Sequence, residues 1–403
     1  MDRETGRVVV VGGGLAGVRA VEALRARGFG GGLTLVSAEA HRPYDRPPLS
    51  KAVLAGDADD TAVDADWDAL RCDLLLGERA TALRLDGRGG AVATTAGELP
   101  FDGLVVATGA TPVTLPGPGR QHVLRTLEDA RDLRARLVPG ARVVIVGAGW
   151  IGAEVATAAA RKGGRVTVVE AGPAPLGHAL GAELGARTAP WYAEAGVELR
   201  TGAGVASVED GGLLLADGTR IDADAVVTGV GVRPNVGWLS GSGLDVERGV
   251  LTDSALRASV DGTARPDVVA VGDCAAWWSR RYGRRLLVEH WDTALNAPET
   301  AAATLLGEAA EYDAVPYFWS EQFGRMVQYA GRHEGAERRV DRGDPAAGPW
   351  SALWLTGDRI DAVLAVDRPR DLVQARKIMT TGAAVDSEKV TDPNIPLRQC
   401  VRA

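Results

Sequence analysis

A strand, glycine turn and helix that occur twice, followed by a C-terminal group of strands and a helix, predict an α/β protein. The expected fold has two Rossmann-like dinucleotide-binding domains and a C-terminal α+β domain. The repeated stretches are RVVVVGGGLAGVRA (7–20) and RVVIVGAGWIGAEVA (142–156). The C-terminal strands are SALWLT (351–356) and DAVLAV (361–366), and a helical pattern begins at about Arg370.

Length, charge and cysteine use limit the class of protein. A chain of 403 residues is too long for one compact core. The net charge of −8 argues against a nucleic-acid binder, because no basic excess exists to neutralise phosphates. The sequence shows neither a signal-peptide pattern nor an apolar run long enough for a membrane span. Cys72, Cys274 and Cys400 form no disulfide or metal motif, so we expect a cytoplasmic protein without a metal site.

The first glycine turn has every part that a dinucleotide site needs. The apolar run at 8–11 is typical of a strand buried on both faces of a parallel sheet. GxGxxG spacing lets the backbone approach a pyrophosphate, and the following helix directs its unpaired N–H groups at it. A second strand, LTLVS (33–37), leads to Glu39, whose carboxylate can accept both hydroxyls of an adenosine ribose. The predicted binding residues of the turn are Gly12, Gly14, Leu15, Ala16 and Gly17.

The second turn repeats these parts. The second strand here is RVTVV (165–169), and Glu170 ends it. The predicted binding residues are Gly147, Gly149, Trp150, Ile151 and Gly152, with Gly231 of the apolar segment 225–235. Two such turns indicate two dinucleotides. One could be a nicotinamide cofactor that exchanges and the other a flavin that stays, with hydride passing between them.

Three further segments complete a recognisable pattern: LVVATGATP (104–112), AVVTGVGVRPN (225–235) and PDVVAVGDCA (266–275). A carboxylate such as Asp273, at a strand end, can bind a ribityl chain, although GDCA alone is more often an ordinary turn. Together with the two glycine turns, the segments resemble the two-dinucleotide flavoprotein disulfide reductase superfamily. In that superfamily the N-terminal turn and the GD motif bind FAD, and the inserted central domain binds NAD(P)H.

The chain most resembles the ferredoxin reductase branch of this superfamily, which includes the reductase components of bacterial P450 and biphenyl-type dioxygenase systems. The resemblance covers nearly the full length. It rests on PYDRPPLSK (43–51), LRTLEDA (124–130), GAGWIGAEVA (147–156), VGDCA (271–275), VEHWDTALNA (288–297), VPYFWSEQF (315–323) and LAVDRPRDLVQARKI (364–378). Ala38 departs from the family, in which an acid often stands there, so Glu39 is the only ribose acid. The stretch 259–267 is longer than usual.

The resemblance implies that Lys51 and Glu154 lie beside the flavin N5. A fixed ammonium there stabilises the negatively charged reduced ring, and a paired carboxylate keeps the lysine in place. The alternative for Lys51 is a solvated surface lysine, and for Glu154 an exposed helix residue. Lys51 stands in a proline-rich loop of a chain that otherwise uses arginine, which favours the functional interpretation.

Family motifs also imply the remaining flavin contacts. Arg46 and Arg125 would meet phosphate or the adenine side, and Ala80 would contact adenine through its backbone. Asp273 would bind the ribityl chain, and Trp291 would pack on the isoalloxazine. A core tryptophan is the competing interpretation of Trp291, because the chain has 10 tryptophans.

Glu170 also predicts the choice of nicotinamide cofactor. Its carboxylate would accept the 2′-OH of NADH and repel the 2′-phosphate of NADPH. The stretch AGPAPLGHA (171–179) holds no arginine, and the positions that can be basic in the family are Ala174 and His178. We therefore expect NADH to be preferred.

The expected division of the chain is an FAD-binding domain in two parts (1–108 and 236–316), an NAD-binding domain (109–235) and an interface domain (317–403). No cysteine stands near Lys51 to relay electrons as a dithiol, and no iron–sulfur ligand set is present. We expect an iron–sulfur ferredoxin as the one-electron partner, serving a cytochrome P450 or a ring-hydroxylating oxygenase, and a monomer or weak dimer. The alternatives are an NADH oxidase or a quinone or dye reductase, and a redox-sensing flavoprotein similar to apoptosis-inducing factor.

The segment WWSRRYGRRLLVEHW (277–291) suggests where that partner docks. Its four arginines cluster in a chain that is acidic overall: Arg280, Arg281, Arg284 and Arg285. Ferredoxins are commonly acidic, so a local basic patch would steer one toward the adjoining Trp291. The alternative is a solvated arginine-rich loop.

Overall fold

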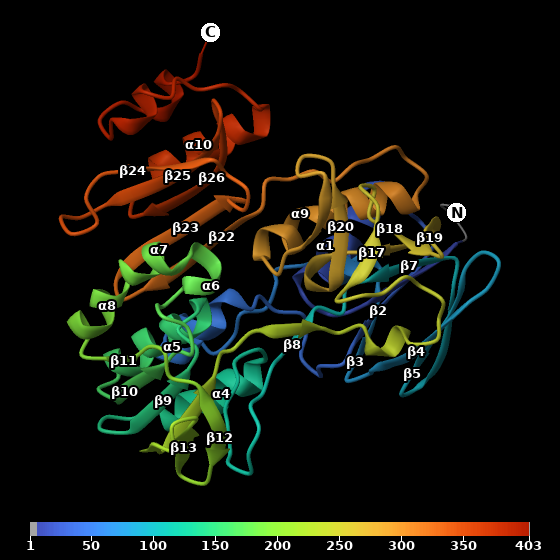
Figure 1. Cartoon of the computed structure of the whole chain (residues 1–403). Coiled ribbons are helices and arrows are strands. Elements are labelled where there is room, and N and C mark those ends of the chain that lie inside the picture. The colour runs from blue at the N-terminus through green and yellow to red at the C-terminus, as the bar shows by residue number, and fades with distance from the viewer. Residues whose placement is uncertain (1–5, 403) are drawn as a thin grey trace. The chain divides into compact units, whose positions relative to one another are not determined.

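The computed structural model describes residues 6–402, which form two compact units, each considered by itself (Figure 1). The first unit comprises residues 6–45, 60–111 and 233–316. The second comprises 46–59, 112–232 and 317–402. Each unit contains one of the two glycine turns.

The first unit is built on a nine-stranded sheet in the order β21-β20-β17-β18-β19-β7-β1-β2-β3. Its five strands from β19 to β3 are parallel. These are β1 (Arg7–Val11), β2 (Gly32–Ser37), β3 (Asp73–Leu76), β7 (Gly103–Val106) and β19 (Thr263–Ala270). The remaining strands are β17 (Val250–Thr252), β18 (Arg257–Val260), β20 (Ala275–Ser279) and β21 (Arg284–Leu287).

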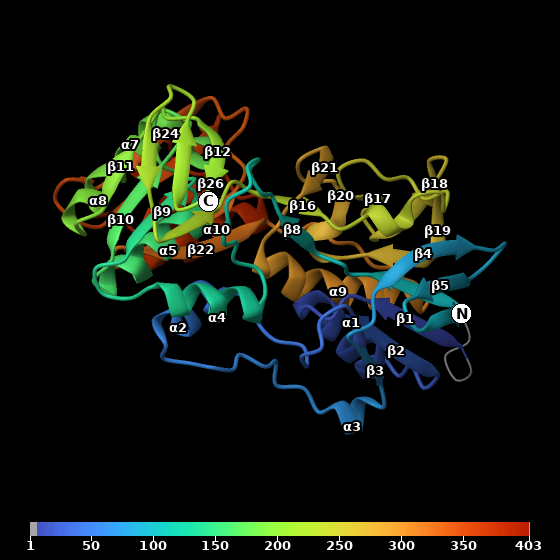
Figure 2. The ribbon, with the colours of Figure 1, turned by 90° about the horizontal axis from the view of Figure 1, so that it is seen from below.

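Both faces of this sheet are covered, as the unbroken apolar run of β1 predicts. Val8 and Val10 face one core cluster, which helices α1 (Leu15–Ala26) and α9 (Trp291–Leu305) complete; the two helices lie side by side in Figure 2. Val9 and Val11 face another core cluster, to which a three-stranded antiparallel sheet contributes. Its strands are β4 (Ala80–Leu85), β5 (Gly90–Thr94) and β6 (Gly97–Phe101). Shorter elements are α3 (Trp67–Leu70), η2 (Gly237–Leu239), η3 (Gly272–Cys274), and the paired strands β8 (Ala110–Pro112) and β16 (Val232–Pro234).

The second unit contains the second glycine turn in a four-stranded parallel sheet, ordered β11-β10-β9-β15. The strands are β9 (Arg142–Val146), β10 (Arg165–Val169), β11 (Glu198–Arg200) and β15 (Ala225–Thr228). Helices α4 (Leu127–Arg136) and α5 (Trp150–Arg161) share a core with one face. An antiparallel sheet shares a core with the other face of the parallel sheet. Its strands are β12 (Val205–Glu209), β13 (Gly212–Leu215) and β14 (Arg220–Asp222).

Residues 46–59, here called the lysine loop, belong to this second unit. The loop contains η1 (Pro47–Ser50) and α2 (Ala52–Ala55). Leu54 is fully buried in the core that α5 and β9 form, and Arg134 pairs with Asp59 at 2.7 Å. The division expected from the sequence places this loop in the first part of the FAD-binding domain (1–108). The loop instead groups with the second unit because its apolar side chain enters the core of that unit.

The C-terminal part of the second unit is a five-stranded antiparallel sheet in the order β22-β23-β26-β25-β24, with α10 (Pro369–Thr381) packed on it. The strands are β22 (Tyr317–Gln322), β23 (Arg325–Gly331), β24 (Arg338–Arg342), β25 (Trp350–Thr356) and β26 (Arg359–Val366). The predicted strands at 351–356 and 361–366 lie within β25 and β26. Side chains of α6 (Gly177–Leu180), α7 (Ala182–Ala186) and α8 (Ala189–Glu194) share a core with this sheet.

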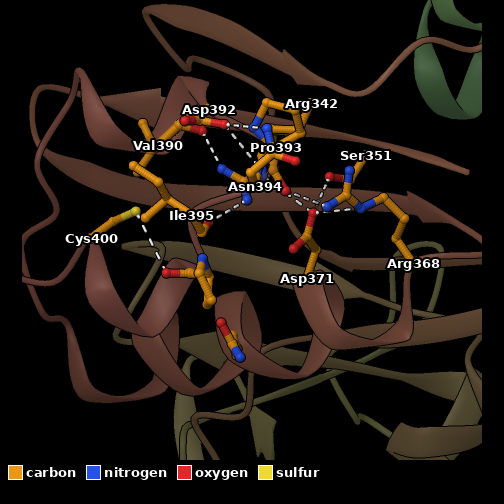
Figure 3. A network of polar contacts seen from close by, with 12 residues as sticks. Arg342, Ser351, Arg368, Asp371, Val390, Asp392, Pro393, Asn394, Ile395 and Cys400 are labelled. Atoms are coloured by element: carbon orange, nitrogen blue, oxygen red, sulfur yellow. Dashed lines mark hydrogen bonds and ion pairs between the residues drawn. The ribbon is translucent and has the colours of Figure 1, made fainter.

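A buried ion pair fastens the end of the chain to this sheet (Figure 3). Arg342 is fully buried, and its guanidinium donates to Asp371 at 3.2 Å. The same guanidinium donates to the carbonyls of Val390 at 2.6 Å and Ile395 at 2.8 Å. These contacts hold the segment with η4 (Lys389–Thr391) and η5 (Leu397–Gln399). A charge buried this deeply is tolerated because it is both paired and hydrogen-bonded.

Candidate functional site: two dinucleotide cradles and a buried lysine–glutamate pair

The first glycine turn has the shape that a dinucleotide needs. Gly12 has φ of 124°, and a Cβ there would lie 2.1 Å from the Ala107 carbonyl oxygen. A Cβ at Gly17 would lie 2.0 Å from the Gly12 oxygen, so the protein's own packing requires both glycines. A Cβ at Gly14 would meet no atom within 4 Å among the described residues. The middle glycine therefore keeps open the space in which a pyrophosphate would approach the start of α1.

The second turn repeats this geometry. Gly147 has φ of 99°, and a Cβ there would lie 2.4 Å from the Gly229 oxygen. A Cβ at Gly152 would lie 1.9 Å from the Gly147 oxygen. Gly149 again opens to free space within the described part of the chain. Both turns thus fit a dinucleotide by the same test.

Each turn is followed by its expected acid, and the two acids have different partners. Glu39 lies two residues beyond β2 and accepts a hydrogen bond from the Tyr44 hydroxyl. Glu170 directly follows β10 and accepts from the backbone N–H groups of Ala148 at 2.8 Å and Gly172 at 2.7 Å. A carboxylate has about four lone-pair sites, so Glu170 with these two donors can also accept from ribose hydroxyls.

Several predicted flavin residues lie in the same unit as the first turn. Asp273 lies in η3, and a Cβ at the preceding Gly272 would lie 3.1 Å from the Ala16 Cβ, so the GD motif adjoins the start of α1. Trp291 is the first residue of α9, and its Nε1 donates to Asp45 at 2.8 Å. Ala80 begins β4.

The other predicted flavin residues lie in the second unit. The Arg46 guanidinium donates to the Arg125 carbonyl. Lys51 Nζ is 2.9 Å from Glu154 Oε2, and the two side chains are 22% and 4% exposed. Glu154 is therefore no exposed helix residue, and Lys51 is no freely solvated lysine. A carboxylate buried on α5 needs donors, and the pair supplies one of them.

Glu154 has two further donors that the sequence did not predict. The Ser50 hydroxyl donates to Oε2, and the Ser320 hydroxyl donates to Oε1 at 2.6 Å. Ser320 lies 166 residues away, on β22. The only signal in the sequence was its place in the family motif VPYFWSEQF, since a serine in a strand has no characteristic pattern of its own.

The predicted nicotinamide contacts lie at the start of α5 and after β15. Ile151 is 42% exposed, although it is a large apolar residue. Trp150 instead packs edge-on against Phe318, with ring centroids 4.4 Å apart. Gly231 has φ of 111° and opens to free space within the described residues. Ala174 is buried and His178 is exposed.

The four arginines of the predicted docking patch lie on the hairpin of β20 and β21. Arg280 pairs with Glu311 at 2.6 Å, and the backbone N–H of Arg281 donates to Asp313 at 3.0 Å. Arg285 donates to the carbonyls of Thr252 and Ala276. Trp278, which pairs with Arg285 across the hairpin, is 42% exposed. The hairpin therefore presents a basic and partly apolar surface. Neighbouring acidic side chains neutralise part of its positive charge.

For residues 6–402, the sequence predicts neither a metal site nor a membrane-spanning segment. No group of three or more His, Cys, Asp or Glu side chains in that range is placed to hold a metal ion. None of the helices described there is long and apolar enough to cross a membrane.

Comparison with known proteins identifies the family. The model of the pyridine nucleotide-disulphide oxidoreductase family matches residues 6–299, and the reductase C-terminal family matches 317–401. A ferredoxin–NAD(+) reductase component of the anthranilate 1,2-dioxygenase system of Burkholderia cepacia is 38% identical over 97% of this chain and 98% of its own. The crystal structure of Fdr9 is 50% identical, with a TM-score of 0.92 over 98% of this chain and 99% of its own. The covalent putidaredoxin reductase–putidaredoxin complex gives 34% identity and a TM-score of 0.92, with 98% of both chains covered.

Proposed function

The chain belongs to the pyridine nucleotide-disulphide oxidoreductase family, and from this premise we propose that it is an FAD-dependent NADH:ferredoxin reductase. One observation carries the proposal: two dinucleotide cradles, each with free space at its middle glycine among the described residues, occur in a chain that matches a ferredoxin–NAD(+) reductase component over nearly its whole length. The reductase C-terminal domain over residues 317–401 supports the same assignment.

FAD, when bound, accepts two electrons as a hydride and releases them one at a time. The first cradle, with Glu39, Asp273 and Trp291, would hold it. Arg46, Lys51 and Arg125 are the further residues that the family resemblance assigns to FAD. The Lys51 ammonium would stabilise negative charge on the reduced ring. Glu154 would keep that ammonium in place, and its burial excludes the water that would otherwise weaken the pair.

NADH would bind at the second cradle, with its pyrophosphate at the start of α5. Glu170 would accept the hydroxyls of the adenosine ribose and disfavour a 2′-phosphate. The two backbone donors on Glu170 support this role, because they fix the carboxylate at the end of β10 before any ligand arrives. The exposed Ile151 would present an apolar surface to the cofactor.

The electron acceptor would be an iron–sulfur ferredoxin that serves a cytochrome P450 or a ring-hydroxylating oxygenase. We place its docking site on the β20–β21 hairpin, which carries the four exposed arginines and the exposed Trp278. A cytoplasmic location is consistent with the three unpaired cysteines. The comparisons favour this function over an NADH oxidase or a redox-sensing flavoprotein, because the matched relative is a ferredoxin reductase component.

The test is a stopped-flow experiment with the FAD-bound protein. NADH should bleach the flavin absorbance within one turnover, and adding a bacterial [2Fe–2S] ferredoxin should reoxidise the flavin faster than oxygen does. Cytochrome c reduction should depend on the ferredoxin. Oxygen consumption at a comparable rate without ferredoxin would instead identify an NADH oxidase, and a long-lived reduced complex with a change in oligomeric state would identify a redox sensor.

A further inference from the structure

We infer that Ser320, a residue of the C-terminal domain, is a positioning residue for the Lys51–Glu154 pair and sets the rate at which NADH reduces the flavin. This inference rests on the proposed function, because it takes the pair to act on the flavin. It gives the C-terminal domain a part in holding the Lys51–Glu154 pair.

The hydrogen bonds of Glu154 divide between its two oxygens. Oε2 accepts from Ser50 and Lys51, both in the lysine loop. Oε1 accepts from Ser320 at 2.6 Å, the one donor to that oxygen among the described residues. Without Ser320 the carboxylate would be held from one side only. It could then rotate about its last torsion, which is broad and soft for a glutamate.

Ser320 is itself fixed in direction. It is fully buried on β22, and its hydroxyl has one hydrogen, which goes to Glu154. Its oxygen accepts from Gln322 Nε2 at 3.1 Å. The hydrogen bonds therefore run in one direction, from Gln322 to Ser320 to Glu154, and the hydroxyl cannot turn away without leaving a buried donor unpaired.

A second contact joins the same strand end to α5. The backbone N–H of Phe323 donates to the Thr157 hydroxyl at 2.9 Å, and that hydroxyl donates to the Ala153 carbonyl at 2.8 Å. Thr157 lies almost one helical turn beyond Glu154. The end of β22 is thus fastened to α5 at Ser320 and again at Phe323, so that the Ser320 hydroxyl reaches the carboxylate from a rigid position.

A buried serine can also satisfy a buried carboxylate for stability alone, and the chain contains a matched example. Ser351, fully buried on β25, donates to Asp371 at 2.7 Å in the network of Figure 3. That carboxylate pairs with Arg342 and Arg368. Ser351→Ala therefore removes the same kind of bond from the same domain, at a carboxylate that has no proposed redox role.

The experiment compares Ser320→Ala, Ser320→Thr and Ser351→Ala as FAD-bound proteins in stopped flow. Ser320→Ala should lower the limiting rate of flavin reduction by NADH on the order of tenfold, since small displacements of a charged group cost rates of this size. The NADH dissociation constant should change less than twofold, because the hydrogen bonds of Ser320 go to Glu154 and Gln322 and not to the proposed NADH residues. Ser320→Thr retains the hydroxyl and should recover most of the rate. Ser351→Ala should leave the rate unchanged.

A double-mutant cycle with Glu154→Gln separates positioning from general damage. Ser320→Ala should slow reduction far less in the Glu154→Gln background, because the carboxylate that it positions is gone. An equal loss in both backgrounds, or a loss equalled by Ser351→Ala, would overturn the inference. If Lys51→Met and Glu154→Gln themselves leave flavin reduction unchanged, the proposed role of the pair fails. If they slow it and Ser320→Ala does not, only the role of Ser320 fails.

Discussion

The two glycine cradles are nearly identical in backbone and differ in what surrounds them. In both, the first and third glycines are forced by contacts below 2.5 Å, and the middle glycine opens to free space among the described residues. Two residues after that middle glycine, the first cradle has Ala16, which is 6% exposed, and the second has Ile151, which is 42% exposed. The GD motif lies against Ala16. The first cradle is thus closed by its own unit, and the second remains open.

A second difference appears three residues further along each helix. The first cradle has Arg19, which is partly exposed and pairs with Glu22 at 2.6 Å. The second has Glu154, which is 4% exposed and has three donors. The same local fold therefore carries an ordinary surface ion pair in one helix and a buried charged pair in the other. A closed cradle suits a cofactor that remains bound, and an open cradle suits a cofactor that exchanges. The buried Lys51–Glu154 pair suits the unit that would bind NADH, the hydride donor.

The largest expected effects come from filling the space at each middle glycine. Gly14 and Gly149 have φ of −82° and −78°, which alanine adopts without strain. Gly14→Ala should weaken FAD retention, and Gly149→Ala should raise the NADH dissociation constant, each by roughly a hundredfold, because a methyl group would stand where a pyrophosphate meets the backbone. Equilibrium dialysis and NADH titration of the purified variants measure the two constants.

These variants are informative only if the protein folds, and the geometry predicts that it does. Replacing glycine by alanine at a compatible position stabilises a protein by about 0.4–1 kcal/mol. The control is Gly12→Ala, where a Cβ would lie 2.1 Å from a carbonyl oxygen and folding should fail. Loss of FAD in Gly149→Ala, with NADH binding retained, would reverse the assignment of the two cradles.

The buried pair gives the next largest effect. Lys51→Met should keep FAD bound and slow flavin reduction by NADH in stopped flow by roughly a hundredfold, because the charge that stabilises the reduced ring is removed. Lys162→Met, at the C-terminal end of α5, is the matched control, and NADH should reduce its flavin at the normal rate. Normal kinetics in Lys51→Met with full FAD would show that the lysine serves only the structure.

Much of what the two cradles share could be predicted from local patterns in the sequence. The strand, turn and acid of each cradle are encoded within about 30 residues, and the structure places them as predicted. The pairing of Lys51 with Glu154 was available only through resemblance, because 103 residues separate them. The place of the lysine loop and the contact of Ser320 were not predictable. The sequence around Leu54 and around Ser320 has no local pattern that indicates these contacts. Only tertiary packing decides which core Leu54 enters and which carboxylate Ser320 contacts.

The two ribose acids offer a sharper test of which cradle selects the nicotinamide cofactor. Glu170→Ala with His178→Arg should shift the ratio of kcat/KM values toward NADPH by roughly ten- to hundredfold, or ~1–3 kcal/mol. Removing the carboxylate ends its repulsion of the 2′-phosphate and frees two backbone donors, Ala148 N–H and Gly172 N–H. Glu39→Ala should weaken FAD retention and leave the NADH to NADPH ratio unchanged. An unchanged ratio in the first variant would show that Glu170 does not select the cofactor.

The smallest expected effect concerns the surface by which electrons leave the first unit. Arg281→Glu with Arg284→Glu reverses two charges on the β20–β21 hairpin, beside the exposed Trp278. An acidic ferredoxin would lose electrostatic steering, so ferredoxin-mediated cytochrome c reduction should fall severalfold at low ionic strength and less at high salt. Ferricyanide reduction by NADH should barely change, because that acceptor needs no docking site.

The effect should be modest because neighbouring acids already reduce the charge of this hairpin, and because steering acts mainly on the association rate. Arg84→Glu with Arg88→Glu makes the same change in net charge near the turn between β4 and β5 of the same unit, and should leave ferredoxin reduction unaltered. If ferredoxin reduction falls equally in this control variant, the net charge of the protein, and not the charge of the hairpin, governs the association rate. If cytochrome c and ferricyanide reduction fall together, the hairpin variant has lost its flavin. If neither falls, the ferredoxin docks on another surface.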